Sequence, residues 1–280
     1  MTAYSVYDVF SDKPFGGNQL AVIPDATNLS EHDLQRIARE FNFSETTFVY
    51  PPKGNQNTAR VRIFTPTMEV PFAGHPIIGT AVALADAGHG PDMTLELGIG
   101  PIATQAENGR ASFVTSAPLQ RLHEPDISLV SRALGATIDA ISTAKHPPVM
   151  ASLGLAFTIT ELNDRDALRA LTTDVSAFRE GNAAYPSGLD FAQFAYVRTG
   201  SHIDARMFAP LDNIPEDPAT GSACATLAAL LAEIEGRDLS LTIMQGEDMG
   251  RPSEIIATSK GTAVTIAGKA VLTMRGELVY

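Results

Sequence analysis

Cysteine is almost missing from this sequence: Cys224 is the only one in 280 residues. A single thiol cannot form a disulfide within the chain, so nothing suggests secretion. The histidines form no His-x-x-x-His pair and Cys-x-x-Cys does not occur, so we expect no metal site. No apolar run reaches the roughly 18 residues of a membrane span. The N-terminus also lacks a signal-peptide pattern. These features predict a soluble cytoplasmic protein.

Basic residues are also scarce. The chain has 20 Lys and Arg against 32 Asp and Glu, which gives a net charge of −12 and a pI of about 4.9. Binding to nucleic acid needs clustered cations, and an anionic membrane repels an acidic surface. We therefore expect no nucleic-acid or membrane partner. A small anionic molecule stays possible, because it responds to the local charge of its pocket.

Strand-like and helical stretches alternate along the chain and predict an α+β fold. One helix is expected over residues 30–42, with Ser30 as N-cap, Asp33 as its capping-box partner and an apolar face of Leu34, Ile37 and Ala38. The expected strands cover residues 4–10, 20–24, 46–51, 59–66, 191–197, 205–210, 239–245, 253–259, 262–268 and 269–276.

An internal repeat is the strongest signal in the sequence. The pattern R-x-F-x-P occurs at 62–66 and at 206–210, and x-P-x-x-G-[ST]-A follows it at 75–81 and at 217–223. A weaker echo precedes both, FSETTFV at 43–49 and FAQFAYV at 191–197. Repeats of this kind indicate duplicated structural units. We expect two similar domains related by a pseudo-two-fold axis, with their junction within residues 116–128.

Each repeat opens an apolar helix. Pro76 and Pro218 suit the first helical position, which places His75 and Asp217 at or next to the N-cap. The following residues are apolar nearly all round, which predicts two buried helices over 75–87 and 218–234.

A glycine follows three residues after each proline, Gly79 and Gly221, and we expect both in the first helical turn. Glycine costs roughly 1 kcal/mol there, which makes sense if a ligand approaches the backbone. Two helix N-termini facing one another across a cleft would hold a carboxylate. The alternative is that the glycines serve tight helix–sheet packing and that Asp217 is only a cap.

Five segments together resemble the PhzF family of phenazine-biosynthesis isomerases: PFGGNQLAV, FSETTFV, RIFTPTMEVPFAGHPIIGTA, EDPATGSA and QGEDMGRPS. The resemblance implies a diaminopimelate-epimerase-like fold, in which each of two domains curls a mixed sheet around a central helix. It implies an N-terminal domain over 1–118, to which a C-terminal strand at about 268–280 returns, and a second domain over 119–267. It also implies an active site in the cleft, a homodimer, and no metal or organic cofactor.

The family motifs carry functional residues onto this chain. Glu45 matches the catalytic acid/base of the family, and His75 and Asp217 match its other polar active-site groups. Further matches line the substrate in the family: Asn18, Ser44, Gly74, Gly221 and Ser222. One small departure is GGNQ in the first turn, where GNP is common.

The residues themselves agree with an acid/base mechanism. The related epimerases use two cysteines, so a chain with Cys224 alone cannot follow them, and a small buried thiol is the simpler interpretation. Burial of Glu45 in the cleft would raise its pKa toward the range useful for proton transfer, the alternative being an exposed strand glutamate. Gln193 stands at the echoed position, which predicts one base only. A neutral hydrogen-bonding His75 is favoured near a helix N-terminus, the alternative being a structural histidine. Arg251 is left out of the site.

We therefore expect a cofactor-independent isomerase that shifts a proton on a small cyclic or amino-acid-like carboxylate. In the phenazine-making relatives this substrate is trans-2,3-dihydro-3-hydroxyanthranilate. Two alternatives stay open: a racemase or epimerase that uses Glu45 and Asp217 on opposite faces of a carbon, and a non-catalytic binder of small anions.

Overall fold

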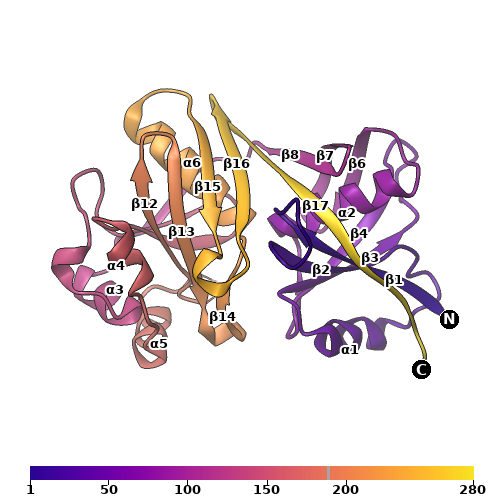
Figure 1. Cartoon of the computed structure of the whole chain (residues 1–280), viewed down its shortest axis with the longest axis horizontal. Helices are drawn as coiled ribbons and strands as arrows, with labels where there is room; N and C mark the ends of the chain where they lie inside the picture. Colours follow the sequence, from indigo (N-terminus) through magenta and orange to yellow (C-terminus); the bar gives the residue numbers. More distant parts are fainter. Residues whose placement is uncertain (188–189) are drawn as a thin grey trace. The chain divides into compact units, whose positions relative to one another are not determined.

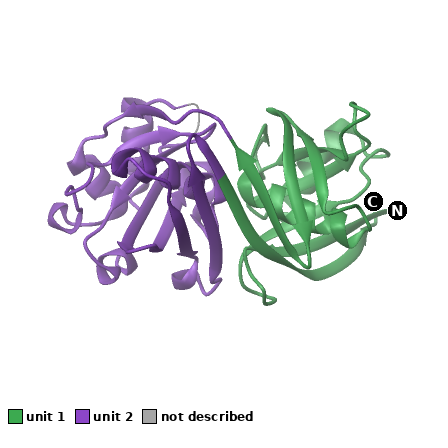
Figure 2. Cartoon of the chain, turned by 90° about the horizontal axis from the view of Figure 1, so that it is seen from above, with its two compact units in different colours: residues 1–115, 265–280 green, residues 116–264 purple. Residues whose placement is uncertain are grey.

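The computed structural model describes residues 1–187 and 190–280. Its contacts divide the chain into two compact units (Figure 2). Unit 1 comprises residues 1–115 and 265–280, and unit 2 comprises residues 116–264. Both units mix strands with helices, which confirms the α+β class. No helix in the described part of the chain is long and apolar enough to span a bilayer.

Unit 1 is a sheet with one helix on each face (Figure 1). Its helices are α1 (Glu31–Phe41) and α2 (Gly74–Asp86). Helix α2 contacts β1, β2, β3, β7 and β8, whereas α1 packs on the opposite face against Phe48 and Phe64. The strands are β1 (Thr2–Val9), β2 (Asn18–Ile23), β3 (Glu45–Tyr50), β4 (Ala59–Phe64), β5 (Glu69–Val70), β6 (Asp92–Leu97), β7 (Gly100–Glu107), β8 (Arg110–Thr115) and β17 (Ala263–Leu278).

In unit 2, helix α6 (Gly221–Glu235) packs against β10, β11, β15 and β16. Three further helices share a hydrophobic cluster with Ala195 and Phe208, namely α3 (Ile127–Leu134), α4 (Arg165–Arg169) and α5 (Val175–Ala184). The strands are β9 (Gln120–His123), β10 (Val149–Ser152), β11 (Ala156–Glu161), β12 (Gln193–Thr199), β13 (His202–Ala209), β14 (Ile214–Asp217), β15 (Ser240–Gln245) and β16 (Ser253–Lys260).

The two units pair their strands in the same order. In unit 1, β2–β3 is parallel, β3–β4 and β4–β5 are antiparallel, β4–β6 is parallel, and β6–β7 is antiparallel. The pairs β11–β12, β12–β13, β13–β14, β13–β15 and β15–β16 repeat these directions in unit 2. The buried helix follows the fourth strand of each series, as the sequence repeat requires.

Helix α1 begins and packs as its sequence predicts. Ser30 is the N-cap, and its hydroxyl accepts from the backbone N–H of Asp33 and donates to the Asp33 carboxylate. Leu34, Ile37 and Ala38 are its buried residues. These signals are local in sequence, and the prediction is confirmed.

The two apolar helices are buried nearly all round, which is also confirmed, but their predicted starts are wrong. Helix α2 begins at Gly74 after an Ala73 cap, so His75 lies inside the first turn. Pro76 is tolerated there because the N–H groups of the first turn have no intrahelical acceptor. Helix α6 begins only at Gly221, and Asp217 is the last residue of β14. Its antiparallel pairing with Met207 holds Asp217 extended, and a residue before proline also resists helical geometry.

Gly79 is not in the first turn of α2 but is its sixth residue. A Cβ atom at this position would lie 2.5 Å from Leu20 Cδ2 and 2.7 Å from Val9 Cγ2. The glycine therefore lets the helix approach β1 and β2 closely, which is the packing alternative stated above.

The two strands predicted over 262–276 are one. Strand β17 runs without a break over 16 residues, with Gly268 inside it. Strand β1 pairs antiparallel with the second part of β17, from Val9 against Ala270 to Thr2 against Leu278, and the N–H of Phe10 donates to the Lys269 carbonyl. The strand begins in unit 2 and continues in unit 1.

Candidate active site

The register of β3 decides where Glu45 points. Side chains alternate between the two faces of a strand, so Glu45 shares a face with Thr47. The hydroxyl of Thr47 accepts a 3.0 Å hydrogen bond from Thr80 of α2. Glu45 therefore faces α2, and it begins β3 next to the start of that helix. The exposed-glutamate alternative is wrong, because only 14 % of the side chain is exposed.

Four of the expected site residues meet in unit 1. Glu45 Oε2 lies 3.3 Å from Nδ1 of His75. The same Nδ1 lies 3.4 Å from the amide nitrogen of Asn18, whose oxygen accepts a 3.2 Å hydrogen bond from Ser44. Gly74 precedes His75 as the first residue of α2, and both are buried. The segments that provide these residues are separated in sequence and are joined by the β2–β3 pairing and by α2.

Burial controls the charge of His75. The residue is 3 % exposed, and loss of solvation lowers its pKa to about 3. The imidazole is therefore neutral at physiological pH. A hydrogen bond with the backbone of Gln19 acts in the opposite direction on this pKa, but burial has the larger effect. When the ring proton is on Nε2, Nδ1 can accept from the Asn18 amide, whereas its 3.3 Å approach to Glu45 Oε2 is a close contact and not a hydrogen bond. Among the described residues, the buried Nε2 finds no hydrogen-bond partner.

The remaining site candidates belong to unit 2. Asp217 is 5 % exposed, and its Oδ2 accepts a 2.5 Å hydrogen bond from the hydroxyl of Thr220. Gly221 and Ser222 follow as the first two residues of α6, and both are buried. Their N–H groups lie at the positive end of the helix, where the first turn has no intrahelical acceptors. Because these residues and Glu45 lie in different units, their grouping in one pocket stays a prediction.

Gln245 was missed in the sequence, although it stands at the head of the conspicuous segment QGEDMGRPS. Its amide nitrogen donates to the Asp217 carbonyl at 2.7 Å and to the Thr220 hydroxyl at 3.0 Å, and its oxygen accepts from the Thr220 N–H at 3.0 Å. Gly246 follows with φ +76°, and a Cβ there would lie 2.4 Å from the Arg251 carbonyl oxygen and 2.7 Å from that of Pro218. This turn fixes the loop between β14 and α6.

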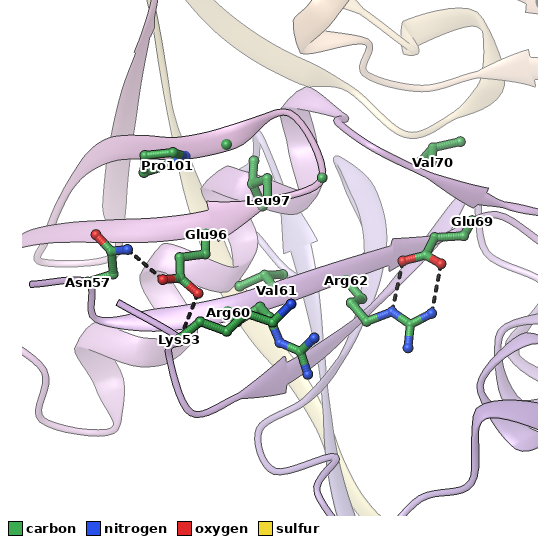
Figure 3. Close-up of a pocket in the computed structure, with 12 residues that line it drawn as sticks. Lys53, Asn57, Arg60, Val61, Arg62, Glu69, Val70, Glu96, Leu97 and Pro101 are labelled. Carbon is green, nitrogen blue, oxygen red and sulfur yellow. Dashed lines mark hydrogen bonds and ion pairs between the residues drawn. The ribbon is translucent and has the colours of Figure 1, made fainter. Parts of the chain in front are cut away.

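The sequence gives the arginines of the R-x-F-x-P repeats no role, whereas the structure shows that each pairs with a glutamate. Arg62 forms two hydrogen bonds with Glu69, at 2.8 and 2.7 Å (Figure 3), and Arg206 forms two with Glu216, both at 2.8 Å. Each pair ties the strand that carries the arginine to the short strand before the buried helix. Glu216, the first acid of EDPATGSA, is therefore a positioning residue beside Asp217.

The strand register corrects the echo between the two halves. Thr46 pairs with Phe64, and Gln193 pairs with Phe208, the equivalent phenylalanine of the second repeat. Gln193 therefore corresponds to Thr46, and Ala192 corresponds to Glu45. The sequence echo was misread by one residue, which is enough to change the face of a strand. No acid stands at the Glu45 position in unit 2.

The lone cysteine of the chain lies inside helix α6. Cys224 is fully buried and unoxidised, and burial raises the pKa of its thiol well above the ordinary value. A buried neutral thiol is a packing residue, as the simpler interpretation had it. Within residues 1–187 and 190–280, no group of three His, Cys, Asp or Glu side chains is placed to hold a metal ion.

Comparisons with known proteins cover nearly the whole chain. A family model described as phenazine biosynthesis-like protein, PhzC-PhzF, matches residues 7–276. A trans-2,3-dihydro-3-hydroxyanthranilate isomerase of Pseudomonas chlororaphis is 37 % identical over 293 residues, with all of both chains covered.

Solved structures agree on the fold. A PhzF-family phenazine biosynthesis protein of Bacillus anthracis matches with a TM-score of 0.86 at 23 % identity, and the match covers 100 % of this chain and 99 % of that one. A hydroxyproline epimerase of Agrobacterium vitis matches with a TM-score of 0.66 at 14 % identity, over 99 % and 90 % of the chains. At such identities the likeness concerns the fold alone.

Proposed function

Because the chain belongs to the PhzF family of isomerases, we propose that it moves a proton between carbons of a small carboxylated substrate without a cofactor, with Glu45 as the proton carrier. The relative from Pseudomonas chlororaphis is named for trans-2,3-dihydro-3-hydroxyanthranilate. We extend that class of substrate, a cyclic or amino-acid-like carboxylate, to this chain. One observation supports the proposal above all: a largely buried Glu45 carboxylate lies 3.3 Å from a histidine that burial keeps neutral.

The neutrality of His75 matters for the strength of the base. A protonated imidazole at this distance would stabilise the Glu45 carboxylate and weaken it as a base. A neutral ring 3.3 Å away does not stabilise the charge of the carboxylate in this way, so Glu45 keeps its strength as a base. In this proposal Glu45 takes a proton from one carbon and delivers a proton to another.

The other residues have binding roles in this proposal. Asp217, whose carboxylate is oriented by Thr220, holds an amino or hydroxyl group of the substrate. The N–H groups at the starts of α2 and α6, near Gly74 and Gly221, bind the substrate carboxylate or stabilise an enolate that forms during the proton shift.

The test replaces the carboxylate of Glu45. Glu45→Gln keeps the shape and one hydrogen-bonding oxygen but cannot accept a proton. We expect its turnover of trans-2,3-dihydro-3-hydroxyanthranilate to fall by at least about two orders of magnitude, while a substrate analogue still binds. Glu45→Asp moves the base back by about 1 Å, and misplacement on that scale can cost about 10²-fold, so some activity remains.

The measurement is product formation together with deuterium uptake from D₂O. The control is Glu107→Gln, which removes a carboxylate from an exposed site on β7 and leaves the rate unchanged. Normal turnover by Glu45→Gln would show that the base lies elsewhere, with Asp217 as first candidate. Deuterium at a stereocentre that inverts would instead favour the racemase alternative. Ligand binding without any C–H exchange in the wild type would favour the anion-binder alternative.

A further inference from the structure

A groove on unit 1 has no part in the proposed reaction. It has a volume of about 440 Å³ and lies over β4, β6 and the turn between β6 and β7 (Figure 3). Its charged and amide side chains are Lys53, Asn57, Arg60, Arg62, Glu69 and Glu96. Three cations and two carboxylates line it, and Glu31 of α1 adds a third carboxylate on Arg62. Among the described residues, the lining cations without an ion pair are Lys53 and Arg60.

The two carboxylates of the groove are already occupied. Glu96 accepts from the backbone N–H groups of Lys53 and Gly54, at 2.8 and 2.7 Å, and from the Asn57 amide at 2.6 Å. These bonds lower the pKa of Glu96 and keep it ionised. Glu69 is held by Arg62, which also binds Glu31 of α1.

Neither carboxylate of the groove forms an ion pair with Arg60. Its neighbour across the β4–β6 ladder is Glu96, whose oxygens are taken by other donors. Within the described residues, the side chain of Arg60 forms neither an ion pair nor a hydrogen bond, and its Nε is buried. The guanidinium carbon lies 4.5 Å from the centre of the Tyr50 ring, so stacking holds the group in place.

A second cation without an ion pair extends toward Arg60. Lys53 makes hydrogen bonds only through its backbone in the described part of the chain, and Figure 3 shows its side chain running below Glu96 toward Arg60. The planar guanidinium matches the two oxygens of a phosphate or carboxylate, and an ammonium group adds a point charge beside it.

We propose that Arg60 and Lys53 bind a small phosphate- or carboxylate-bearing molecule in this groove. The guanidinium binds two oxygens of the anion through its two Nη groups, and the Lys53 ammonium binds a third. This site lies wholly within unit 1 and is independent of the proposed reaction.

The sequence offers a direct reporter, because it contains no tryptophan. Tyr50→Trp places a single indole under Arg60, and an indole is the better platform for a guanidinium. Its fluorescence is followed while inorganic phosphate or citrate is added at constant ionic strength, which holds general screening fixed. We expect a saturable change with at least one probe. The probe that saturates at the lower concentration identifies phosphate or carboxylate as the preferred chemistry.

The matched variants separate a site from diffuse charge. Arg60→Gln in the Tyr50→Trp background should weaken binding at least about tenfold, since a charge-assisted bidentate contact is lost. Arg110→Gln, which removes an exposed cation of β8, should leave it unchanged. The absence of saturation, or equal weakening by both variants, would overturn the proposal. If Tyr50→Trp does not fold, the Nε–Hε resonance of Arg60 in the wild-type NMR spectrum gives the same readout.

Discussion

The repeated arginine–glutamate pairs give a matched experiment on how the Asp217 segment is held. Glu216→Ala removes both 2.8 Å contacts to Arg206, whose side chain is 11 % exposed. The Nη1 group of this arginine stays bound to the carbonyl oxygens of Leu168, Arg169 and Leu171, so the guanidinium cannot move out to water. Breaking a buried pair on one side costs about 3–5 kcal/mol. We expect about 2 kcal/mol, below that range, because the Glu216 side chain is 16 % exposed and Asp248 Oδ2 still lies 4.0 Å from the Arg206 Nε.

Glu69→Ala breaks the equivalent pair in unit 1 and serves as the control. The Glu69 side chain is 44 % exposed, and Arg62 keeps Glu31 as a second carboxylate. An exposed pair contributes about 1 kcal/mol or less. The free energy of unfolding is measured by urea denaturation, with the turnover of trans-2,3-dihydro-3-hydroxyanthranilate followed in parallel. We expect Glu216→Ala to lower kcat as well, because Glu216 immediately precedes Asp217. Equal destabilisation by the two variants would refute the claim that burial gives the Arg206 pair its strength.

Two further predictions concern the loop after β15 and the buried histidine. Gly246→Ala places a Cβ atom against the Arg251 carbonyl, so we expect a loss of about 2–3 kcal/mol in stability and of much of the activity. The control is Gly250→Ala, because Gly250 has a similar φ of +72° with open space around it, and we expect it to cost about 1 kcal/mol. Both costs are measured by thermal unfolding. Folding lowers the pKa of His75 to about 3, so between pH 6.5 and 3 the unfolded chain binds a proton that the folded chain does not. The free energy of unfolding therefore decreases as the pH is lowered through that window, by up to about 1.4 kcal/mol per pH unit. His75→Asn should show a shallower fall in urea titrations at several pH values, and an unchanged slope would contradict the burial argument.

The features predicted correctly from the sequence depend on neighbours along the chain. The Ser30 cap of α1 and its apolar face lie within eleven residues, so propensity and periodicity are sufficient. The two buried helices are predicted for the same reason, because a helix that is apolar on every side must be buried.

The errors arise where a distant partner decides. The start of α6 is delayed because β13 pairs with β14 and because Gln245, 28 residues beyond Asp217, takes the carbonyl of that residue. Strand β17 does not divide at Gly268 but continues to Leu278, and β1, from the other end of the chain, pairs with its residues 270–278. The arginine–glutamate pairs could not be predicted for a further reason. The arginine repeats in the sequence, but its glutamate follows seven residues later in one half and ten residues later in the other.

The strand register also bears on how many residues act as the proton-transferring base. Sequence similarity alone matched Glu45 with Gln193, which left a polar group at the same place in both halves. The pairings with Phe64 and Phe208 instead put Ala192 there, and its side chain can neither accept nor donate a proton. Asp217, the candidate site acid of unit 2, belongs to β14, the strand before the buried helix. Its position in unit 2 is therefore not equivalent to that of Glu45 in unit 1. A duplicated fold that keeps an acid at this position in one copy only favours a single base for both proton removal and proton delivery, which is the mechanism proposed for Glu45.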